Sequence, residues 1–451
     1  MAAAYASKTL ADFAASLDWR DIPADVIDRA KICILDTVGV AGYGAHFPWS
    51  QGIARYAALY GTGGPCTVFG MPGLHLHAPY AALANGAFAH AFEQDSLRFP
   101  GAGVHPGAVL LPAALAIAQE VGADGRDLIE AFVAGCEVMF RIGSASRHSS
   151  EGLGFHAPGL TGPYGAAIAA GRLLGLDSGR LVNALGIAGS LSSGLLAFTK
   201  AERGAEVKKL HLGRAAESGV LAARLAAEGL AGPETVLEGR FGFLETYCRD
   251  GDPGRLTGGL GSDWETRRIC VKSYPCHVTA HTPVRAMRGL MAEHSFGPSD
   301  VLEIRIEAAP KVLSHHNLTN PADVMQAQYS VPFCVALAMY RDPSDPRSFD
   351  AEAVSDPGIR ALCRKVQLTP FPANEQPESG WHTRVRVTLR DGRSLSRDQQ
   401  RFAGMPGEAM ELADVRSKFL LLAQERSGSS ASAPFDRWMQ LEHEVSLEWC
   451  S

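Results

Sequence analysis

Four short segments of this chain place lysine or histidine beside proline, glycine and other small residues. The most informative is residues 272–277, Lys-Ser-Tyr-Pro-Cys-His. Residues 105–107 (His-Pro-Gly), 155–156 (Phe-His) and 208–211 (Lys-Lys-Leu-His) have the same character. Ammonium groups attract carboxylates, and an imidazole exchanges a proton near neutral pH. These residue types therefore predict a site for a small polycarboxylate.

Length and charge limit the class of protein that could carry such a site. The chain has 451 residues, of which 46% are hydrophobic. This is enough for two cores, because a single core seldom grows beyond about 300 residues. The formal net charge is −6, and like charges form no block. A nucleic-acid partner is therefore not expected, and any basic site must be local.

The cysteines and the N-terminus predict a reducing compartment. The nine cysteines are scattered and include no C-x-x-C pair, so neither a disulfide framework nor a zinc ribbon is indicated. Residues 1–8 lack a basic segment followed by an apolar one, and no run of about 18 uncharged apolar residues occurs. We expect a cytoplasmic protein without a membrane partner.

The elements that would position these side chains are helical over the first half of the chain. Apolar residues recur at helical spacing from Val26 to Val38, and Pro23 and Asp25 suit a first turn, which predicts a helix over 25–42. No strand pattern separates the helices that follow, so an all-α domain is expected. Further helices are predicted at 79–92, 106–121, 125–144, 160–175, 179–196 and 212–229.

The pattern changes after about residue 251. Apolar and charged residues alternate over 302–308 and 385–389, which predicts two half-buried strands, and Asp391-Gly392 suits a turn after the second. Apolar spacing over 277–294 and 330–341 predicts two helices between them. A mixed α+β domain over 265–400 follows.

The C-terminal tail returns to helix. Helical spacing covers 407–425, a Ser-rich loop covers 427–434, and a last helix runs to about residue 448. We expect this tail to pack on the first domain. The predicted fold is mainly α with a smaller α+β domain: residues 1–264 and 401–451 form a helical domain, into which 265–400 are inserted.

Several motifs resemble those of the MmgE/PrpD family, which includes 2-methylcitrate dehydratase, cis-aconitate decarboxylase and iminodisuccinate epimerase. The resemblance covers nearly the whole chain and implies a large helical domain, a smaller α+β domain and a homodimer. It also implies no metal. In chain order, the matching segments are 27–42, 85–90 (Asn-Gly-Ala-Phe-Ala-His), 105–107, 154–156, 210–213 and 272–277.

The resemblance implies which side chains surround the substrate. His156 and Lys272 are the candidates for proton transfer, with Lys208 as a further cation. Asp95 and His105 complete the catalytic candidates; Asp95 orients a histidine or acts as a second acid or base. The residues expected to bind the substrate are Glu93, Lys209, Tyr274 and His277.

One segment departs from the family pattern. Dehydratases and decarboxylases carry His-x-x-Asp-Phe-Asp-Asp-Thr, whereas residues 90–97 read His-Ala-Phe-Glu-Gln-Asp-Ser-Leu, so that only Asp95 among the acidic positions matches strictly. Elimination of water needs a polar partner for the departing hydroxyl, and Leu97 has none, whereas epimerisation needs only proton removal and return at one carbon. The chain is therefore interpreted as an enzyme that removes a proton alpha to a carboxylate of a small di- or tricarboxylate, with an epimerase slightly favoured over a dehydratase-like or decarboxylase-like lyase.

Simpler interpretations stand beside these roles. His211 is expected to be a structural, hydrogen-bonded residue, and at least one of Lys208 and Lys209 is expected to face solvent. Tyr274 is also compatible with packing, while His277 is expected to open a helix whose N-terminus favours anions. A catalytically silent binding or assembly module is the alternative of another class. Its mark would be loss of Lys272 and His156, and both are present.

No metal and no cofactor are predicted. The pairs at 75/77, 277/281 and 315/316 bring two histidines together but have no third ligand at a diagnostic spacing. Residues 61–64 (Gly-Thr-Gly-Gly) are not followed by the Lys-Ser/Thr of a phosphate-binding loop. The α/β pattern expected around a pyridoxal phosphate lysine is likewise missing.

Overall fold

A computed structural model describes residues 5–101, 103–201, 205–375, 377, 379–423 and 432–450. The chain divides into two compact units. Unit 1 contains residues 1–91, 95–270 and 412–451, and unit 2 contains residues 92–94 and 271–411. Three residues of the first half, Phe92–Gln94, thus belong to unit 2 although unit 1 contains the chain on both sides of them.

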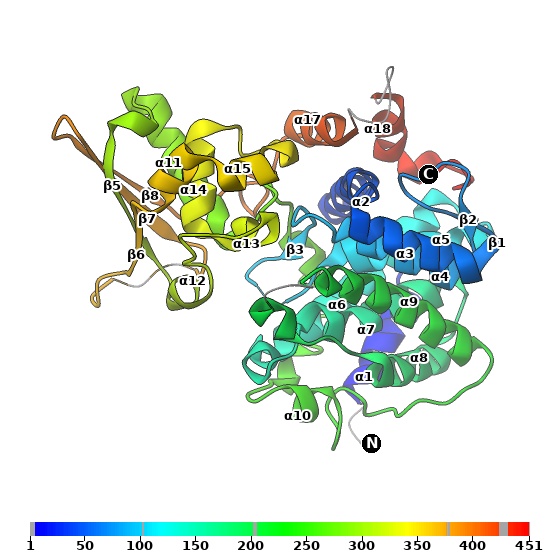
Figure 1. Ribbon diagram of the computed structural model, residues 1–451. Helices are drawn as coiled ribbons and strands as arrows, with labels where there is room; N and C mark the ends of the chain where they lie inside the picture. The colour runs from blue at the N-terminus through cyan, green and yellow to red at the C-terminus, as the bar shows by residue number, and fades with distance from the viewer. Residues whose placement is uncertain are drawn as a thin grey trace. The chain divides into compact units, whose positions relative to one another are not determined.

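Unit 1 is built mainly from helices, as the sequence predicts. Its centre is four helices that pack on one another, α4 (Ala78–Ala89), α5 (Pro106–Val121), α7 (Ala157–Leu173) and α9 (Val207–Ala227). Figure 1 shows these helices in blue to green. The remaining α-helices of its first part are α1 (Ala6–Ser16), α2 (Ala24–Gly44), α3 (Pro48–Gly61), α6 (Gly125–Ala145), α8 (Ser178–Leu191) and α10 (Phe243–Tyr247).

Glycine allows two of the central helices to approach closely. A Cβ at Gly86 of α4 would lie 2.9 Å from the Cα of Gly213 of α9, and a Cβ at Gly213 would lie 2.3 Å from the carbonyl oxygen of Leu83. Real side chains do not tolerate such distances, so either substitution would push the helices apart. The N-terminus of α9 is thereby fixed against α4.

The predicted helices differ from the observed ones mainly at their ends. The helix expected over 179–196 ends at Leu191, because Ser192 adopts an extended backbone with a ψ of 128°, and Gly194 follows with a φ of +126°. The helix expected over 79–92 ends at Ala89, and the one expected at 212 begins earlier, at Val207. The segment released after Leu191 pairs with residues 154–156, which matters for the site described below.

The expectation of an all-α domain is wrong in detail. Strand β1 (Thr62–Thr67) pairs with β2 (His75–Leu76), and β3 (Leu97–Arg98) pairs with β4 (Ile269–Cys270), both antiparallel. These strands are too short, or too rich in glycine, to give an alternating pattern in the sequence. The first ribbon borders α3, α4 and α5.

The C-terminal tail belongs to unit 1 and packs on α2, as predicted. Helix α17 (Leu412–Ala423) contacts α2, where Lys418 Nζ lies 2.6 Å from Asp36 Oδ1. Helix α18 (Ser432–Met439) also contacts α2. The last helix was predicted to reach residue 448, but it ends at Met439 and only a short 3₁₀ turn, Leu441–His443, follows. The predicted loop lies outside the described residues at 427–431, and 432–434 already belong to α18.

Unit 2 is the predicted mixture of helices and strands. Four strands in the order β6-β5-β7-β8 form its sheet, in which β5 and β6 are parallel and the other pairs are antiparallel. Helices α11 and α14 pack beside this sheet (Figure 1). The strands are β5 (Val301–Ala308), β6 (Val366–Pro370), β7 (Thr383–Leu389) and β8 (Ser394–Gln399), and the helices are α11 (His281–His294), α12 (Pro310–His315), α13 (Val324–Tyr329), α14 (Val331–Tyr340), α15 (Ala351–Ser355) and α16 (Pro357–Cys363).

The register of the sheet explains the alternation seen in the sequence. Ile304 and Ile306 of β5 lie opposite Val387 and Val385 of β7, and all four side chains are buried. The fold class is therefore confirmed as mainly α with a smaller α+β part. None of the helices in the described part of the chain is long and apolar enough to cross a bilayer.

Candidate functional site

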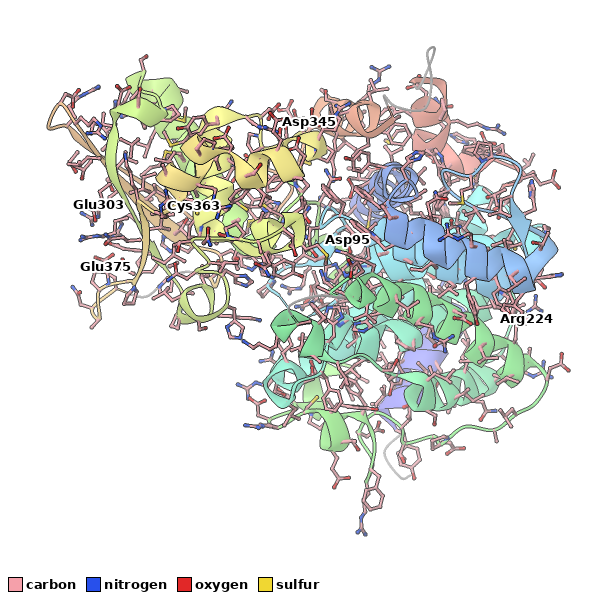
Figure 2. All side chains as sticks on the ribbon, viewed as in Figure 1. Asp95, Arg224, Glu303, Asp345, Cys363 and Glu375 are labelled. Carbon is pink, nitrogen blue, oxygen red and sulfur yellow. The ribbon has the colours of Figure 1, made fainter. Side chains whose placement is uncertain are left out.

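Helix ends bring most of the predicted catalytic residues of unit 1 together. His90 follows the last turn of α4, His105 precedes α5, His156 precedes α7, and the first turn of α9 carries two further members. Asp95, labelled in Figure 2, follows α4 in the chain. We call this group the imidazole cluster: His90, Asp95, His105, His156, Lys208 and His211.

Local sequence explains why two of these helices, α5 and α7, begin here. Pro106 and Pro158 stand in the first turns of α5 and α7, where the missing N–H of proline removes no hydrogen bond. The N-terminus of a helix carries a partial positive charge and unpaired N–H groups, which favour anions. The cluster therefore combines imidazoles with an electrostatic preference for negative charge.

Asp95 joins two of the imidazoles. Its Oδ2 lies 2.8 Å from Nδ1 of His90 and 2.8 Å from Nδ1 of His105. The contact to His90 is an aligned hydrogen bond, whereas the contact to His105 is close without being well aligned. Burial acts to raise the pKa of Asp95, but the attraction of His90 and His105 outweighs it and holds the pKa well below its ordinary value. Asp95 is therefore an ionised carboxylate that orients two rings.

His90 is a functional candidate that the sequence argument missed. It is fully buried, and its Nε2 has no hydrogen-bond partner among the described residues. Burial, partly offset by Asp95, lowers the pKa of this imidazole to about 3. The signal was present, because His90 ends the matching segment 85–90, but nothing local indicates that its ring meets Asp95.

His156 is held by His211 rather than by an acidic residue. The two Nδ1 atoms lie 3.0 Å apart, and the ring centroids are 5.1 Å apart. Burial lowers the pKa of His156 well below its ordinary value, and the positive charge of Lys208 lowers it further. The same two causes lower the pKa of His211 to about 4. Both imidazoles are therefore neutral near pH 7.

The expectation that Lys208 or Lys209 faces solvent is wrong. Their relative exposures are 4% and 1%. The packing of α9 on α4 and α7 encloses both side chains at the start of the helix. Lys208 acts electrostatically on His90, His156 and His211, so it belongs to the cluster.

Unit 2 gathers three predicted residues, Glu93, Lys272 and His277, together with two that the sequence did not predict, His316 and Tyr329. We call these five residues the lysine cluster. Lys272 Nζ donates to the backbone carbonyl oxygen of Glu93 at 2.9 Å and lies 3.3 Å from its Oε2. The hydroxyl of Tyr329 donates to the other carboxylate oxygen at 3.1 Å. Lys272 and Glu93 are both 2% exposed. This is a buried ion pair whose acidic member has a left-handed φ of 57°.

His277 belongs to the lysine cluster in a way the sequence did not predict. Instead of opening an α-helix, it caps the 3₁₀ turn Val278–Ala280, and α11 begins at His281. Its ring stacks on His316 with centroids 4.0 Å apart. The turn runs directly into α11, so His277 stands at the start of a continuous helical segment, and anion binding there stays a prediction.

Tyr274 is placed by packing. Its ring lies 5.1 Å from that of His281, and its backbone N–H donates to His281 Nε2 at 3.3 Å. Burial raises the pKa of its hydroxyl to about 12. No contact between Tyr274 and the named members of the lysine cluster is seen in the described residues.

One group of three residues in the described part of the chain could bring metal ligands together, namely His90, Asp95 and His105. None of the histidine pairs weighed from the sequence forms such a group in these residues. The ligands of tetrahedral zinc, each about 2.1 Å from the ion, lie about 3.4 Å from one another. The 2.8 Å separations at Asp95 are shorter than this and equal those of ordinary charge-assisted hydrogen bonds. A hydrogen bond accounts for the Asp95–His90 contact, and the Asp95–His105 separation is too short for two ligands of one zinc ion.

Removal of metals is therefore expected to leave the protein unchanged. After dialysis against EDTA and 1,10-phenanthroline, the thermal transition should stay where it was, because the His90–Asp95–His105 contacts need no ion. Inductively coupled plasma mass spectrometry on the untreated protein should find substoichiometric metal. A lowered transition that one particular ion restores would contradict this and would assign a metal site to the three residues.

Stability is expected to fall as the pH falls from about 6.5 to 4. Burial lowers the pKa of His90 to about 3 and that of His316 to about 4, whereas an unfolded chain titrates near 6.5. Between these values only the unfolded chain takes up the two protons, so protonation favours unfolding. Asp95 stays ionised in the folded state throughout this pH range, so it does not offset the loss of stability. Each of the two imidazoles lowers the free energy of unfolding by about 1.4 kcal/mol for every pH unit of acidification within this range.

Chemical denaturation at several pH values checks this expectation. A His316→Phe variant keeps an aromatic ring against His277 but cannot titrate, so its stability should depend less steeply on pH than that of the wild type. Equal pH slopes would mean that His316 titrates alike in the folded and unfolded states.

Comparison with protein families defines the class. The model of the MmgE/PrpD N-terminal domain matches residues 8–256, and that of the MmgE/PrpD C-terminal domain matches residues 274–436. Together they cover most of the chain, with the helical and α+β parts in the expected order. The chain therefore belongs to the MmgE/PrpD family of enzymes.

Three relatives named as cis-aconitate decarboxylases or as a protein like them are similar to this chain. A cis-aconitate decarboxylase of Homo sapiens is 30% identical over 406 residues, which cover 87% of this chain and 82% of the relative. A cis-aconitate decarboxylase of Aspergillus terreus is 30% identical over 439 residues, which cover 91% and 88%. A cis-aconitate decarboxylase-like protein of Aspergillus oryzae is 31% identical over 416 residues, which cover 86% and 84%. Similarity thus extends over nearly the full length of each relative.

Proposed function

We propose that this protein catalyses proton transfer at a carbon next to a carboxylate of a small di- or tricarboxylate. The observation that carries the proposal is the imidazole cluster. In this cluster His105 contacts the carboxylate of Asp95, and the neutral imidazole of His156 faces that of His211. The buried lysine beside them is Lys208. A carbon acid of this kind is very weak, so the reaction needs both a positioned base and positive charge for the developing enolate.

Each member of the cluster has a proposed role. His156 is the base, because its depressed pKa keeps it unprotonated at pH 7. His105, with Asp95 behind it, is the second acid or base. Lys208 supplies positive charge that the buried surroundings do not screen. The helix N-termini at His105 and His156 add to this preference for an anion.

We assign carboxylate binding to the lysine cluster. Lys272 is a buried cation and Tyr329 a hydroxyl donor, both of them now engaged with Glu93. A substrate carboxylate has the same chemistry as the side chain of Glu93 and can therefore share these donors. His277 supports the cluster through its stacked ring. Lys209, a buried lysine next to Lys208, and Tyr274, whose ring packs on His281, complete the proposed substrate-binding residues.

Two reactions fit this chemistry. The names of the relatives favour a lyase that acts on a tricarboxylate, as cis-aconitate decarboxylase does. The segment after Asp95 favours an epimerase, because Leu97 is an apolar residue paired with Cys270, and the hydroxyl of Ser96 accepts from the backbone N–H of Gly107. Leu97 has no proton to give to a departing hydroxyl, and the hydroxyl of Ser96 is buried 3.1 Å from Sγ of Cys33.

Incubation with a panel of di- and tricarboxylates in deuterated water tests the proposal. An epimerase incorporates deuterium at one carbon without other loss of mass, a dehydratase releases water, and a decarboxylase releases carbon dioxide; mass spectrometry separates the three. Exchange or turnover with at least one compound is expected. The absence of both with every compound would sink the enzyme proposal and favour a silent binding module.

The remaining expectations are also proposals. We propose a homodimer, a cytoplasmic location and catalysis without a bound cofactor, with residues 265–400 as the inserted α+β domain. Light scattering coupled to size-exclusion chromatography would test the dimer, for which a mass near 96 kDa is expected from two chains of 47.9 kDa each.

A further inference from the structure

The pair formed by His156 and His211 has an unusual composition. In most oriented histidines a carboxylate or a backbone carbonyl accepts the Nδ1–H, but here Nδ1 of one neutral imidazole faces Nδ1 of another at 3.0 Å. His156 is 5% exposed, whereas His211 is only half-buried. The enclosed ring is thus linked to one that reaches solvent.

The surrounding backbone is shaped for this pair. His156 donates its N–H to the carbonyl oxygen of Gly194 at 3.0 Å, and Leu196 donates to Gly154 at 2.8 Å. A Cβ at Gly194 would approach His211 Nδ1 to 3.3 Å, and the φ of +126° also disfavours any other residue there. Phe198 meets both rings edge to face, with centroids at 5.4 and 5.9 Å.

The number of protons restricts what the pair can do. A neutral imidazole carries one N–H, and a hydrogen bond between two Nδ1 atoms needs a proton on one of them only. With the proton on His156 Nδ1, the Nε2 of His156 is bare and can accept a proton. With the proton on His211 Nδ1, the Nε2 of His156 carries a proton that it can donate. The position of one shared proton therefore decides whether His156 is a base or an acid.

We propose that His211 is the positioning residue of His156 and the route by which this buried imidazole exchanges its proton with water. The inference deepens the proposed function and rests on it for the chemical step. A proton leaves the substrate carbon for His156 Nε2, and the electron pair of the broken C–H bond stays on the carbon as an enolate. The Nδ1 proton of His156 moves to Nδ1 of His211, and the Nε2 proton of His211 leaves to water. No oxidant or reductant takes part.

The groups that face the pair favour this path. Lys208 acts on both rings, and His90 and His105 act on His156. The charge of Lys208 disfavours a positive charge on His156, so a proton taken from the substrate is best passed on.

Two substitutions of His211 separate positioning from proton exchange. Asparagine keeps a hydrogen-bonding group close to the position of Nδ1 but cannot relay a proton, whereas phenylalanine keeps the ring and loses both abilities. Nuclear magnetic resonance of ¹⁵N-histidine in the resting protein should report two neutral rings hydrogen-bonded through Nδ1. In His211→Phe the Nδ1 signal of His156 should lose its hydrogen-bond shift, and in His211→Asn it should be retained.

Exchange with water provides the second measurement. The rate at which the His156 N–H exchanges with water should fall by about 10-fold or more in both variants. This is a smaller change than the roughly 10²–10⁴-fold fall in reaction rate that follows the loss of the acid or base itself. With a substrate deuterated at the reacting carbon, the wild type should wash the label into water, and both variants should return it to carbon. The kcat of His211→Asn should exceed that of His211→Phe.

The outcomes distinguish this inference from the function on which it builds. If the wild type turns over no polycarboxylate, the proposed function fails, and the resonance measurements, which need no substrate, still decide the role of His211. Unchanged His156 signals and unchanged N–H exchange in His211→Phe, in a protein with an intact thermal transition, would overturn the inference. His211 would then be a packing residue only.

Discussion

Replacement of His156 by alanine is expected to lower kcat by about 10²–10⁴-fold, the usual contribution of a positioned acid or base. Nδ1 of the neutral His156 ring is hydrogen-bonded to Nδ1 of His211, so its Nε2 is the atom that can take the proton of the substrate. The thermal transition should change little, because the half-buried ring of His211 can exchange its lost partner for water. Initial rates with the substrate found by deuterium exchange provide the measurement.

The matched control is a histidine outside the cluster. His148 lies eight residues earlier in the chain and pairs with Glu151 at 2.6 Å. His148→Ala removes a partly buried imidazole without touching the cluster, so it should keep the turnover of the wild type. If His156→Ala were as active as His148→Ala, the role assigned to His156 would be wrong.

A Lys272→Met variant is expected to lose both turnover and stability. Methionine keeps much of the volume of lysine but leaves the carboxylate of Glu93, which is 2% exposed, without its cation. Removal of one partner from a buried ion pair costs about 3–5 kcal/mol in the free energy of unfolding. Turnover should fall to background because the proposed carboxylate-binding cation is gone. Denaturant titration and initial rates measure the two losses separately.

A double variant separates the two losses. In Lys272→Met/Glu93→Gln the buried charge disappears, while the amide oxygen can still accept from the Tyr329 hydroxyl. Stability should therefore return close to that of the wild type, and turnover should stay absent. A double variant that regained turnover would show that Lys272 serves only to neutralise Glu93.

The sequence predicts the elements better than it predicts the contacts. Helix α2 and strands β5 and β7 follow from the spacing of buried side chains, because burial on one face repeats along the chain. Helix ends are predicted less well: α8 ends at Leu191, where Ser192 becomes extended and Gly194 follows with a φ of +126°, although Leu195 and Leu196 prolong the apolar pattern. The sequence alone does not show whether a glycine allows two helices to pack closely or lies where a helix ends.

Side-chain partners far apart in the chain were the main omission. His156 and His211 are 55 residues apart, and Tyr329 meets Glu93 across 236 residues, so no local pattern encodes either contact. Family motifs pointed to the histidines one by one but not to their pairing. Both lysines at the start of α9 were misjudged for a related reason, since charge alone predicts exposure and only tertiary packing on α4 and α7 buries them.

The short segment Phe92–Gln94 determines which fragment of the chain could fold as unit 2 on its own. A fragment that begins at residue 271 contains the whole sheet and its helices but omits Glu93, so Lys272 would lose the acceptors that it has in the intact chain. It would also lose the carbonyl of Phe92, to which Gln328 Nε2 donates at 3.1 Å. Expression of the α+β part alone should therefore yield an unstable product, unless a peptide containing these three residues is fused to it or supplied in trans.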